Sequence, residues 1–218
     1  MVTIDSLQFD HGQWQAIERK DHIQVFGDDV KHLTAVLSVE MFIGVPEIPV
    51  SLADIDKLRF VYRTIANNSG AGLISADVFN VDGIDCVQTI FKMPQANRGM
   101  VYIGSLTVPF AEFSFVIKIQ CQEVGFTGLR EAVVLDRLFD EGTDVSEENG
   151  ELKNWERDPY DPEGAYPLMP NRAEDERYDE DFPVHALSRV RRWLFQIRET
   201  LHFSEEVKQA QPFVPGGC

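Results

Sequence analysis

Carboxylates crowded into one short segment are the first residues that could do chemistry. The run Asp-Pro-Tyr-Asp-Pro-Glu-Gly brings Asp158, Asp161 and Glu163 close together. Hard cations such as Ca²⁺ bind several carboxylate oxygens at once. The run lacks the regular spacing of acids and glycine found in a calcium loop, and dense charge of this kind usually forms a solvated segment. We therefore predict no metal site, and these three acids are kept as the calcium candidates.

Other catalytic patterns are sparse. Glu123 and Glu131 are carboxylates near a predicted strand end that could work as an acid–base pair, although the sequence does not fix their separation. The histidines show neither an HExxH pattern nor pairing at helical spacing, so we expect surface or capping positions for them. They are His11, His22, His32, His185 and His202. We predict neither a catalytic residue nor a cofactor.

The three cysteines show no CxxC spacing, and their odd number indicates reduced thiols. Cys86 and Cys121 lie in apolar runs, where burial is expected, whereas Cys218 is expected to be exposed. The N-terminal residues contain no basic stretch followed by an apolar one, which argues against a secretory signal. No apolar run reaches the length of a membrane span. We therefore expect a cytoplasmic protein without a membrane segment.

Negative charge is concentrated in residues 140–181. This segment contains 16 of the 36 acidic residues and four basic ones, so it carries −12 of the formal net charge of −16. Such a field repels phosphate backbones, which disfavours nucleic acid and suits a basic protein partner. Aromatic side chains in the same segment commonly anchor interfaces. The residues predicted to contact a partner are Trp155, Tyr160, Asp161, Tyr166, Tyr178 and Asp179.

Periodic patterns indicate the elements that must position these residues. The segments His22–Phe26 and Ala35–Phe42 read as strands, and Trp14–Lys20 predicts one or two helical turns. Apolar residues at helical spacing predict a helix over Ser51–Asn67, with Ser51 as its cap.

A run of four strands follows this helix. Gly72–Val81 and Ile84–Lys92 flank Asp82-Gly83, which is the strongest short hairpin signal in a sequence. Met100–Val108 and Glu112–Glu123 continue the alternation that is typical of half-buried antiparallel strands. Four consecutive strands joined by short turns predict a meander.

The last third of the chain is less regular. Leu129–Phe139 fits a strand or a helix equally well. Residues 140–182 show no sustained periodicity and are rich in proline, which predicts a long loop or disorder whose aromatic residues lie on the domain. Pro183 begins a second helix with an apolar face. Ser204 is expected to cap a short helix, and residues 211–218 are expected to fray.

Three arginines, Arg189, Arg191 and Arg192, lie on the second helix. We expect them to pair with the acidic segment just upstream, each exposed pair contributing about 0–1 kcal/mol. The alternative is that they form a binding site for an anion or a partner.

The order of elements predicts an α+β fold, in which an antiparallel meander sheet is flanked by helices and a long acidic loop precedes the C-terminal helix. The hairpin at Asp82-Gly83, the helix from Ser51 and the strands through Tyr102 and Phe115 resemble the Mog1/PsbP-like proteins over residues 20–140. The resemblance implies a non-catalytic binder, since this family includes assembly factors, photosystem subunits and toxin-neutralising proteins. The acidic segment departs from its pattern.

Three functions remain open for a chain that we expect to form one domain over residues 1–218. The first is a non-catalytic interaction or accessory protein, related to immunity or secretion, that binds a basic protein through residues 140–182. The second is a small-ligand-binding protein or enzyme with a pocket between the sheet and the helices. The third is calcium binding through the acidic segment.

Overall fold

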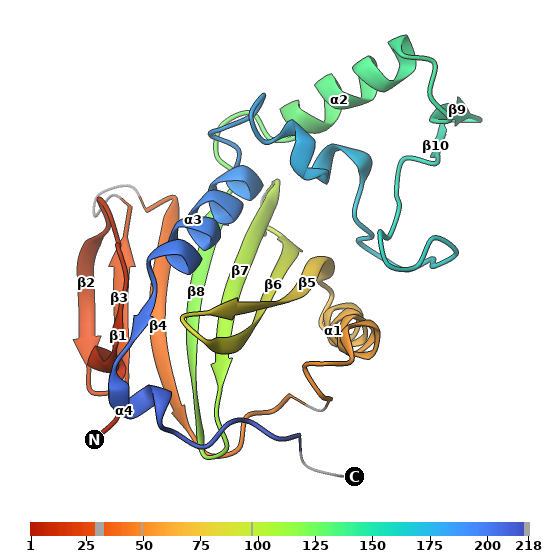
Figure 1. The fold of residues 1–218 in the computed structure, drawn as a ribbon. Coiled ribbons are helices and arrows are strands. Elements are labelled where there is room, and N and C mark those ends of the chain that lie inside the picture. Colours follow the sequence, from red (N-terminus) through yellow and green to blue (C-terminus); the bar gives the residue numbers. More distant parts are fainter. Residues whose placement is uncertain (29–32, 49, 97, 216–218) are drawn as a thin grey trace.

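The computed structural model describes residues 1–28, 33–48, 50–96 and 98–215. Its centre is a seven-stranded antiparallel sheet in the order β2-β3-β4-β8-β7-β6-β5 (Figure 1). The strands are β2 Gln15–Lys20, β3 Ile23–Gly27, β4 Ala35–Ile43, β5 Gly72–Val81, β6 Ile84–Pro94, β7 Met100–Pro109 and β8 Phe113–Gln122. The longer helices are α1 Ile55–Asn68, α2 Leu129–Asp140 and α3 Ala186–Thr200. The predicted α+β fold, an antiparallel meander flanked by helices, is confirmed.

The strands β5 to β8 form the predicted meander. Val81 pairs with Ile84, and the two residues between them have φ angles of +48° at Asp82 and +87° at Gly83. A two-residue turn with positive φ at both positions matches the right-handed twist of a hairpin, which explains the Asp-Gly sequence. The last strand, β8, pairs with β4, which joins the meander to the strands formed by the first 43 residues.

The helices α1 and α3 cover opposite faces of the sheet. Side chains alternate between the two faces along a strand, and on β6 Cys86 belongs to the core beneath α3 whereas Val87 packs with Leu58 of α1. On β7, Gly104 lets α3 come close, because a Cβ there would lie 2.5 Å from a methyl group of Val190. The interface between α3 and the sheet is thus filled by apolar side chains.

Two predictions for the first 70 residues are wrong. Trp14–Lys20 does not form helical turns, because residues 15–20 form β2 and pair with β3. The hydrogen bonds of the sheet outweigh the weak local preference of this segment. The helix α1 begins at Ile55 rather than near Ser51, since the Asp54 carboxylate accepts a hydrogen bond from the Lys57 backbone N–H at 3.2 Å and caps it.

Residues 140–182, which we call the acidic excursion, lie with α2 beyond one end of the sheet (Figure 1). The segment Leu129–Phe139, for which strand and helix were both open, is helical. The acidic excursion contains a short hairpin and two single-turn 3-10 helices. These are β9 Ser146–Glu148, β10 Glu151–Lys153, η2 Arg172–Glu174 and η3 Glu176–Tyr178.

A small second core joins α2 to the acidic excursion. Val134 and Leu138 of α2 pack with Val145, Ala173 and Tyr178, and all five side chains are buried. This cluster is separate from the core beneath α3. The excursion therefore buries apolar surface of its own, which a solvated charge run would not do.

The C-terminal residues return along the sheet. The strand β11 His202–Phe203 pairs with β1 Leu7–Gln8, and α4 Glu205–Lys208 follows with Ser204 at its N-terminal cap position. The carbonyl of Gln211 accepts a hydrogen bond from the Ala111 N–H, so the segment expected to fray begins against the sheet. Cys218 lies outside the described residues. None of the described helices has the length and apolar character needed to cross a bilayer.

Candidate functional site

The 16 acids of the acidic excursion divide into two groups. Eight of them form ion pairs: Asp144, Glu151, Asp158, Asp161, Glu174, Asp175, Asp179 and Asp181. The other eight form none with the residues that the structure describes: Asp140, Glu141, Glu147, Glu148, Glu156, Glu163, Glu176 and Glu180. The first group includes all the acids that fasten the excursion to the rest of the chain.

Arg63 of α1 holds two of the three calcium candidates. One guanidinium nitrogen of Arg63 lies 2.9 Å from Asp158 and 3.1 Å from Asp161, and Asp158 is only 2% exposed. The Tyr166 hydroxyl donates a hydrogen bond to the same Asp158 oxygen. Burial and this contact raise the pKa of Tyr166. The guanidinium thus fills the place that a cation would take, whereas Glu163 makes no ion pair among the described residues.

Tyr160 lies against the sheet. Its hydroxyl oxygen accepts a hydrogen bond from the backbone N–H of Ala76 at 3.2 Å, and the guanidinium of Arg59 sits 4.1 Å from its ring centroid. A cation over an aromatic face is attracted by the ring quadrupole. This contact connects the proline-rich part of the excursion to β5 and α1.

The other predicted partner residues lie at the second core. Trp155 packs against its edge and Tyr178 is 5% exposed. Asp179 accepts hydrogen bonds from Arg130 at 2.9 Å and from Arg191 at 3.1 Å. The structure therefore places most contacts of the six predicted residues inside the molecule. Their role in contacting a partner stays a prediction.

The three arginines of α3 have different partners. Arg191 pairs with Asp179 of the acidic excursion, as expected for the group. Arg189 instead pairs with Asp28 at 2.7 Å, and Arg192 donates a hydrogen bond to the Pro183 carbonyl. Only one of the three therefore ties the excursion down. The fully buried Arg130 of α2, which the sequence did not single out, does more of this work through three acceptors in the excursion.

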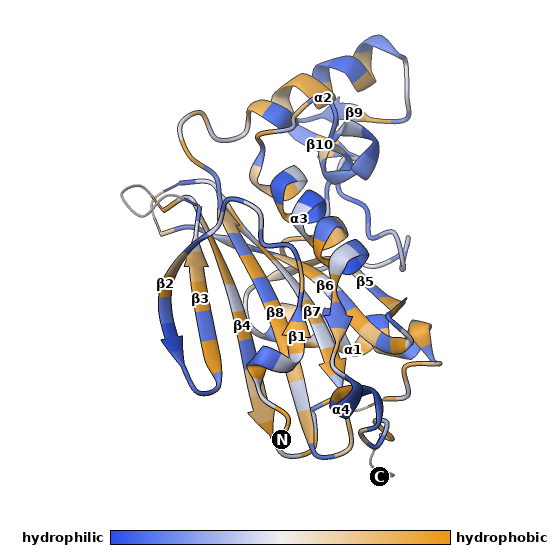
Figure 2. Ribbon diagram, turned by 60° about the vertical axis from the view of Figure 1, so that its left-hand side comes forward, coloured by the Kyte–Doolittle hydropathy of each residue, from blue (hydrophilic) through white to orange (hydrophobic). Residues whose placement is uncertain are grey.

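An apolar surface that the sequence analysis missed runs along α2. Leu129 and Val133 are four residues apart and share one face of the helix, and they are 58% and 39% exposed. Phe139 is 41% exposed, and Phe126, just before the helix, is 94% exposed. Figure 2 shows hydrophobic bands alternating with hydrophilic ones along α2, at the end of the molecule away from the two termini. We call these four residues the α2 surface.

A buried polar network lies where the excursion meets the end of the sheet. The Lys92 ammonium lies 2.8 Å from the Glu174 carboxylate, and both side chains are almost fully buried. Lys92 also donates a hydrogen bond to the Met169 carbonyl, and the Tyr102 hydroxyl donates one to Glu174. The alternation of β6 carries a signal for this network, because it places Lys92 on the same face as the buried Cys86 and Ile90.

Next to this network the structure brings Glu123, Glu131 and His185 together. These residues come from the end of β8, the first turn of α2 and the cap of α3, and one ligand atom of each lies within 4.8 Å of the others. Glu123 and Glu131 line a cavity of about 240 Å³ that is also lined by Lys92 and Tyr102. The acid pair considered from sequence thus exists in space, and its third member is a histidine that the sequence assigned to capping.

The two carboxylates differ in their surroundings. Burial acts to raise the pKa of Glu123, but hydrogen bonds from His185 and from the Met100 N–H outweigh it and hold that pKa below its ordinary value. Burial raises the pKa of Glu131, and the charge of Glu123 adds to the shift. Its Oε2 atom is buried and has no hydrogen-bond partner among the described residues. Such an orphan acceptor is costly in a folded protein.

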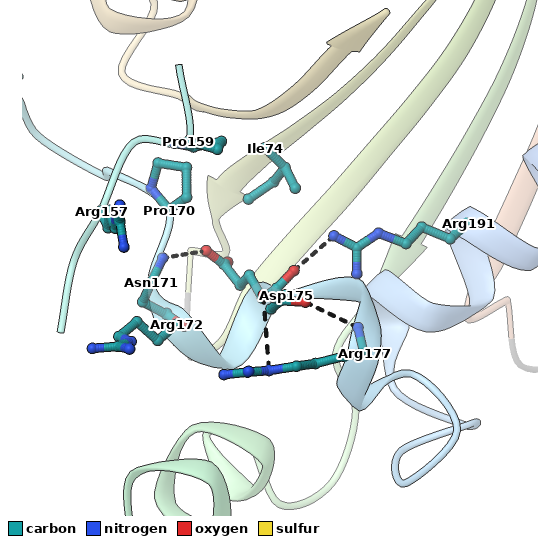
Figure 3. A pocket seen from close by; sticks show the side chains of 10 residues that line it. Ile74, Arg157, Pro159, Pro170, Asn171, Arg172, Asp175, Arg177 and Arg191 are labelled. Carbon is teal, nitrogen blue, oxygen red and sulfur yellow. Dashed lines mark hydrogen bonds and ion pairs between the residues drawn. The ribbon is translucent and has the colours of Figure 1, made fainter. Parts of the chain in front are cut away.

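A larger cavity of about 500 Å³ opens between β5, α3 and the excursion (Figure 3). Four arginines line it: Arg157, Arg172, Arg177 and Arg191. Three of the four are paired with acids, namely Asp144, Asp175 and Asp179. Since most of its positive charge is already neutralised, the cavity offers no strong field for an anion. We assign its arginines a structural role.

Comparisons with known proteins give a likeness of fold. The chain is similar to the Ran-binding protein Mog1p of Saccharomyces cerevisiae, with a TM-score of 0.42 and 10% identity over 89% of this chain and 88% of Mog1p. It is also similar to the cyanobacterial PsbP (CyanoP) of Synechocystis, with a TM-score of 0.37 and 17% identity over 62% of this chain and 82% of that one.

A protein from Bacteroides thetaiotaomicron is similar with a TM-score of 0.35 and 11% identity over 55% of this chain, and the match spans 39% of that protein's length. No family model and no curated protein matches the sequence. The Mog1/PsbP-like fold expected from the order of elements is therefore found among the similar structures, and the likeness concerns the fold only.

Proposed function

We propose that this protein is a non-catalytic interaction protein that binds a basic protein segment on the α2 surface. The observation that carries the proposal is the exposure of Phe126, Leu129, Val133 and Phe139. In the described part of the chain these side chains are 94%, 58%, 39% and 41% exposed, respectively. Exposed apolar patches with a polar rim are typical of protein interaction sites.

Charge around the α2 surface selects the kind of partner. Asp136, Asp140 and Glu141 lie on or directly after α2, and Glu147 and Glu148 are on the nearby hairpin strand β9; all five are exposed. None of them forms an ion pair within the described residues. Acids at the rim of an apolar patch speed the approach of a basic partner and repel an acidic one. An amphipathic segment with apolar residues on one side and lysines or arginines on the other fits both features.

The six residues predicted from sequence fasten two different parts of the molecule. Trp155, Tyr178 and Asp179 pack against α2 or bind Arg130, so they hold the helix that carries the α2 surface. Tyr160, Asp161 and Tyr166 fasten the proline-rich part of the excursion to α1 and β5. We therefore place the direct partner contacts on α2 and β9. A cytoplasmic accessory or immunity protein is compatible with this proposal.

A synthetic amphipathic peptide with leucines on one face and lysines on the other tests the proposal. Fluorescence anisotropy of the labelled peptide should show saturable binding that weakens as salt is added, because rim charges are screened. A version of the peptide with glutamates in place of the lysines should not bind.

A matched pair of variants locates the binding surface. Val133→Ser removes apolar area from the α2 surface and should weaken peptide binding at least about fivefold. Val45→Ser is the control, since Val45 is 69% exposed on a distant part of the chain. Equal affinity of the two variants, or peptide binding that salt does not change, would refute the proposal.

A further inference from the structure

The cluster of Glu123, Glu131 and His185 combines two carboxylates and an imidazole at the base of the acidic excursion. A Zn²⁺ ion at about 2.0–2.2 Å from each ligand keeps neighbouring donor atoms roughly 3–3.5 Å apart. His185 Nε2 and Glu123 Oε1 already lie 3.0 Å apart. The third donor lies within 4.8 Å of both, so a small rotation of the Glu131 side chain closes the set.

The two carboxylates of the cluster differ in the partners that balance their charge. Lys92 is the nearest cation of the cavity, and its ammonium is already engaged by Glu174 at 2.8 Å. Glu123 accepts hydrogen bonds from His185 and from the Met100 N–H, whereas Glu131 Oε2 is buried without a partner among the described residues. A buried oxygen of this kind calls for a donor or a cation. Because the atom is shielded from solvent, a bare ion reaches it more readily than a bulky organic cation.

The backbone around the cluster is shaped to hold Glu123 in place. Gly99 has φ of +82°, and a Cβ at this position would lie 2.8 Å from the Glu123 carboxylate. The Gln95 side chain donates hydrogen bonds to the carbonyls of Glu123 and Met100, which fixes the end of β8 against the start of β7. Ligand side chains that are already held in place lose less conformational entropy when a metal binds.

We propose that Glu123, Glu131 and His185 bind a divalent first-row transition metal ion. The ligand set selects the metal. Imidazole suits Zn²⁺ and other late first-row metal ions, and carboxylates also suit Mn²⁺. Ca²⁺ prefers a site made of oxygen ligands only. Binding is expected to be tighter for Zn²⁺ than for Mn²⁺, in the order that N/O sites generally follow. The metal joins β8, α2 and α3, and so fastens the base of the excursion.

Metal binding changes the hydrogen bonds of His185. Its Nδ1 accepts a hydrogen bond from the Leu187 N–H at 3.3 Å, so the neutral ring carries its proton on Nε2 and donates it to Glu123. Coordination through Nε2 moves this proton to Nδ1 and gives up two hydrogen bonds, the one to Glu123 and the long one from Leu187. These two contacts are thereby exchanged for a metal bond, and the number of protons on the ring is unchanged.

Isothermal titration calorimetry of untagged, chelator-treated protein tests the site, with Zn²⁺, Mn²⁺ and Ca²⁺ as separate titrants. We expect saturable binding of one Zn²⁺ ion per chain, weaker binding of Mn²⁺ and none of Ca²⁺. Glu131→Gln and His185→Asn should each weaken Zn²⁺ binding at least about tenfold, since each removes one of three ligands. Asparagine still accepts a hydrogen bond at a helix cap, so the second variant keeps α3 intact.

The control is Glu163→Gln, which neutralises an exposed acid of the excursion that has no ion pair in the described residues. It should bind Zn²⁺ as the unchanged protein does. Circular dichroism without metal confirms that all variants fold, and bound Co²⁺ should give a visible absorption spectrum that changes in His185→Asn. No saturable binding of Zn²⁺, or Zn²⁺ binding by Glu131→Gln and His185→Asn with the affinity of the unchanged protein, would overturn the proposal. Neither outcome bears on peptide binding at the α2 surface, which is measured separately.

Discussion

The acidic excursion contains two stretches that use the same residue types differently. In residues 155–182, six of ten acids form ion pairs, and Asp158 and Glu174 are almost fully buried. In residues 140–153, two of six acids are paired, and all six are exposed. The partners of five of these six acids come from the sheet and the helices α1, α2 and α3, whereas Asp175 pairs with Arg177 of the same stretch.

The difference follows from where each stretch meets the rest of the chain. The first stretch crosses the ends of β5 and β6 and the start of α3, where Arg63, Lys92, Arg130 and Arg191 provide counter-charges. The second stretch extends beyond α2, where the structure places no such counter-charges from the sheet. The net charge of a segment therefore does not reveal its role, because half of these acids form ion pairs and the other half form none with the residues that the structure describes.

Glu174→Ala should produce the largest loss of stability. It leaves the Lys92 ammonium buried without its ion pair and takes an acceptor from the Tyr102 hydroxyl and the Asn171 N–H. Breaking a buried pair in this way costs about 3–5 kcal/mol of the free energy of unfolding. Urea denaturation measures the change. Glu176→Ala is the control, because Glu176 is exposed, and a loss of the same size there would remove the distinction between the two groups of acids.

Asp158→Asn should loosen the proline-rich part of the excursion while the sheet stays folded. The change removes the charge that binds Arg63 and weakens the hydrogen bond from Tyr166. Hydrogen bonds to charged groups contribute about 1.5–3 kcal/mol. Hydrogen exchange should show faster exchange of the amides of Arg157 and Tyr160, with amides of β7 unchanged. Protection that remains at wild-type level would show that Asp158 does not anchor this segment.

Asp82 provides a test of a paired acid outside the excursion. Its carboxylate accepts hydrogen bonds from the Phe203 N–H and from Lys208, and these contacts hold its pKa below the ordinary value of 3.8. A lowered pKa stabilises the fold above the ordinary pKa, and this stability is lost as the pH falls through the lowered value.

Asp82→Asn keeps a residue that tolerates positive φ in the turn, so it isolates the effect of charge. The variant should lose about 1 kcal/mol at neutral pH, and the difference from the unchanged protein should shrink once the pH drops below 3.8. Thermal melts across a pH series measure this. A difference that stays constant down to the lowest pH would exclude a charge effect at Asp82.

Substitution on the α2 surface should have the smallest effect on stability. Phe126 is 94% exposed, so Phe126→Ser should change the free energy of unfolding by less than about 0.5 kcal/mol. Chemical denaturation checks this. A large loss would mean that Phe126 supports the fold, and the α2 surface would then be smaller than we propose.

The sheet could be predicted from the sequence because its information is local. The alternation on either side of Asp82-Gly83 fixes the hairpin, and the turns between the following strands are short, so that neighbours in sequence are neighbours in the sheet. The strand β2 was missed for the opposite reason. All six of its residues are exposed, so it shows no apolar alternation, and only its pairing with β3 reveals it.

The anchoring of the excursion could not be read from the sequence, because its contacts join distant residues. Arg63 and Asp158 are 95 positions apart, and Lys92 and Glu174 are 82 positions apart. Only part of the cluster of Glu123, Glu131 and His185 could be predicted from the sequence. The two acids are close in sequence, whereas the histidine is 62 positions from Glu123. One local signal for this anchoring is present in the sequence, because the alternation of β6 places Lys92 on the buried face of the strand.

Two variants with the same change of charge test the central claim that the acids have two roles. The tip variant neutralises four unpaired acids: Asp140, Glu141, Glu147 and Glu148. The anchor variant neutralises four paired acids: Asp158, Asp161, Glu174 and Asp179.

The measurement is the affinity for the lysine-rich amphipathic peptide, with the melting temperature of each variant taken in parallel. We predict that the tip variant has the melting temperature of the unchanged protein and binds the peptide at least about tenfold more weakly. The anchor variant should melt at a clearly lower temperature. A tip variant that binds the peptide with full affinity, or that loses as much stability as the anchor variant, would contradict the account.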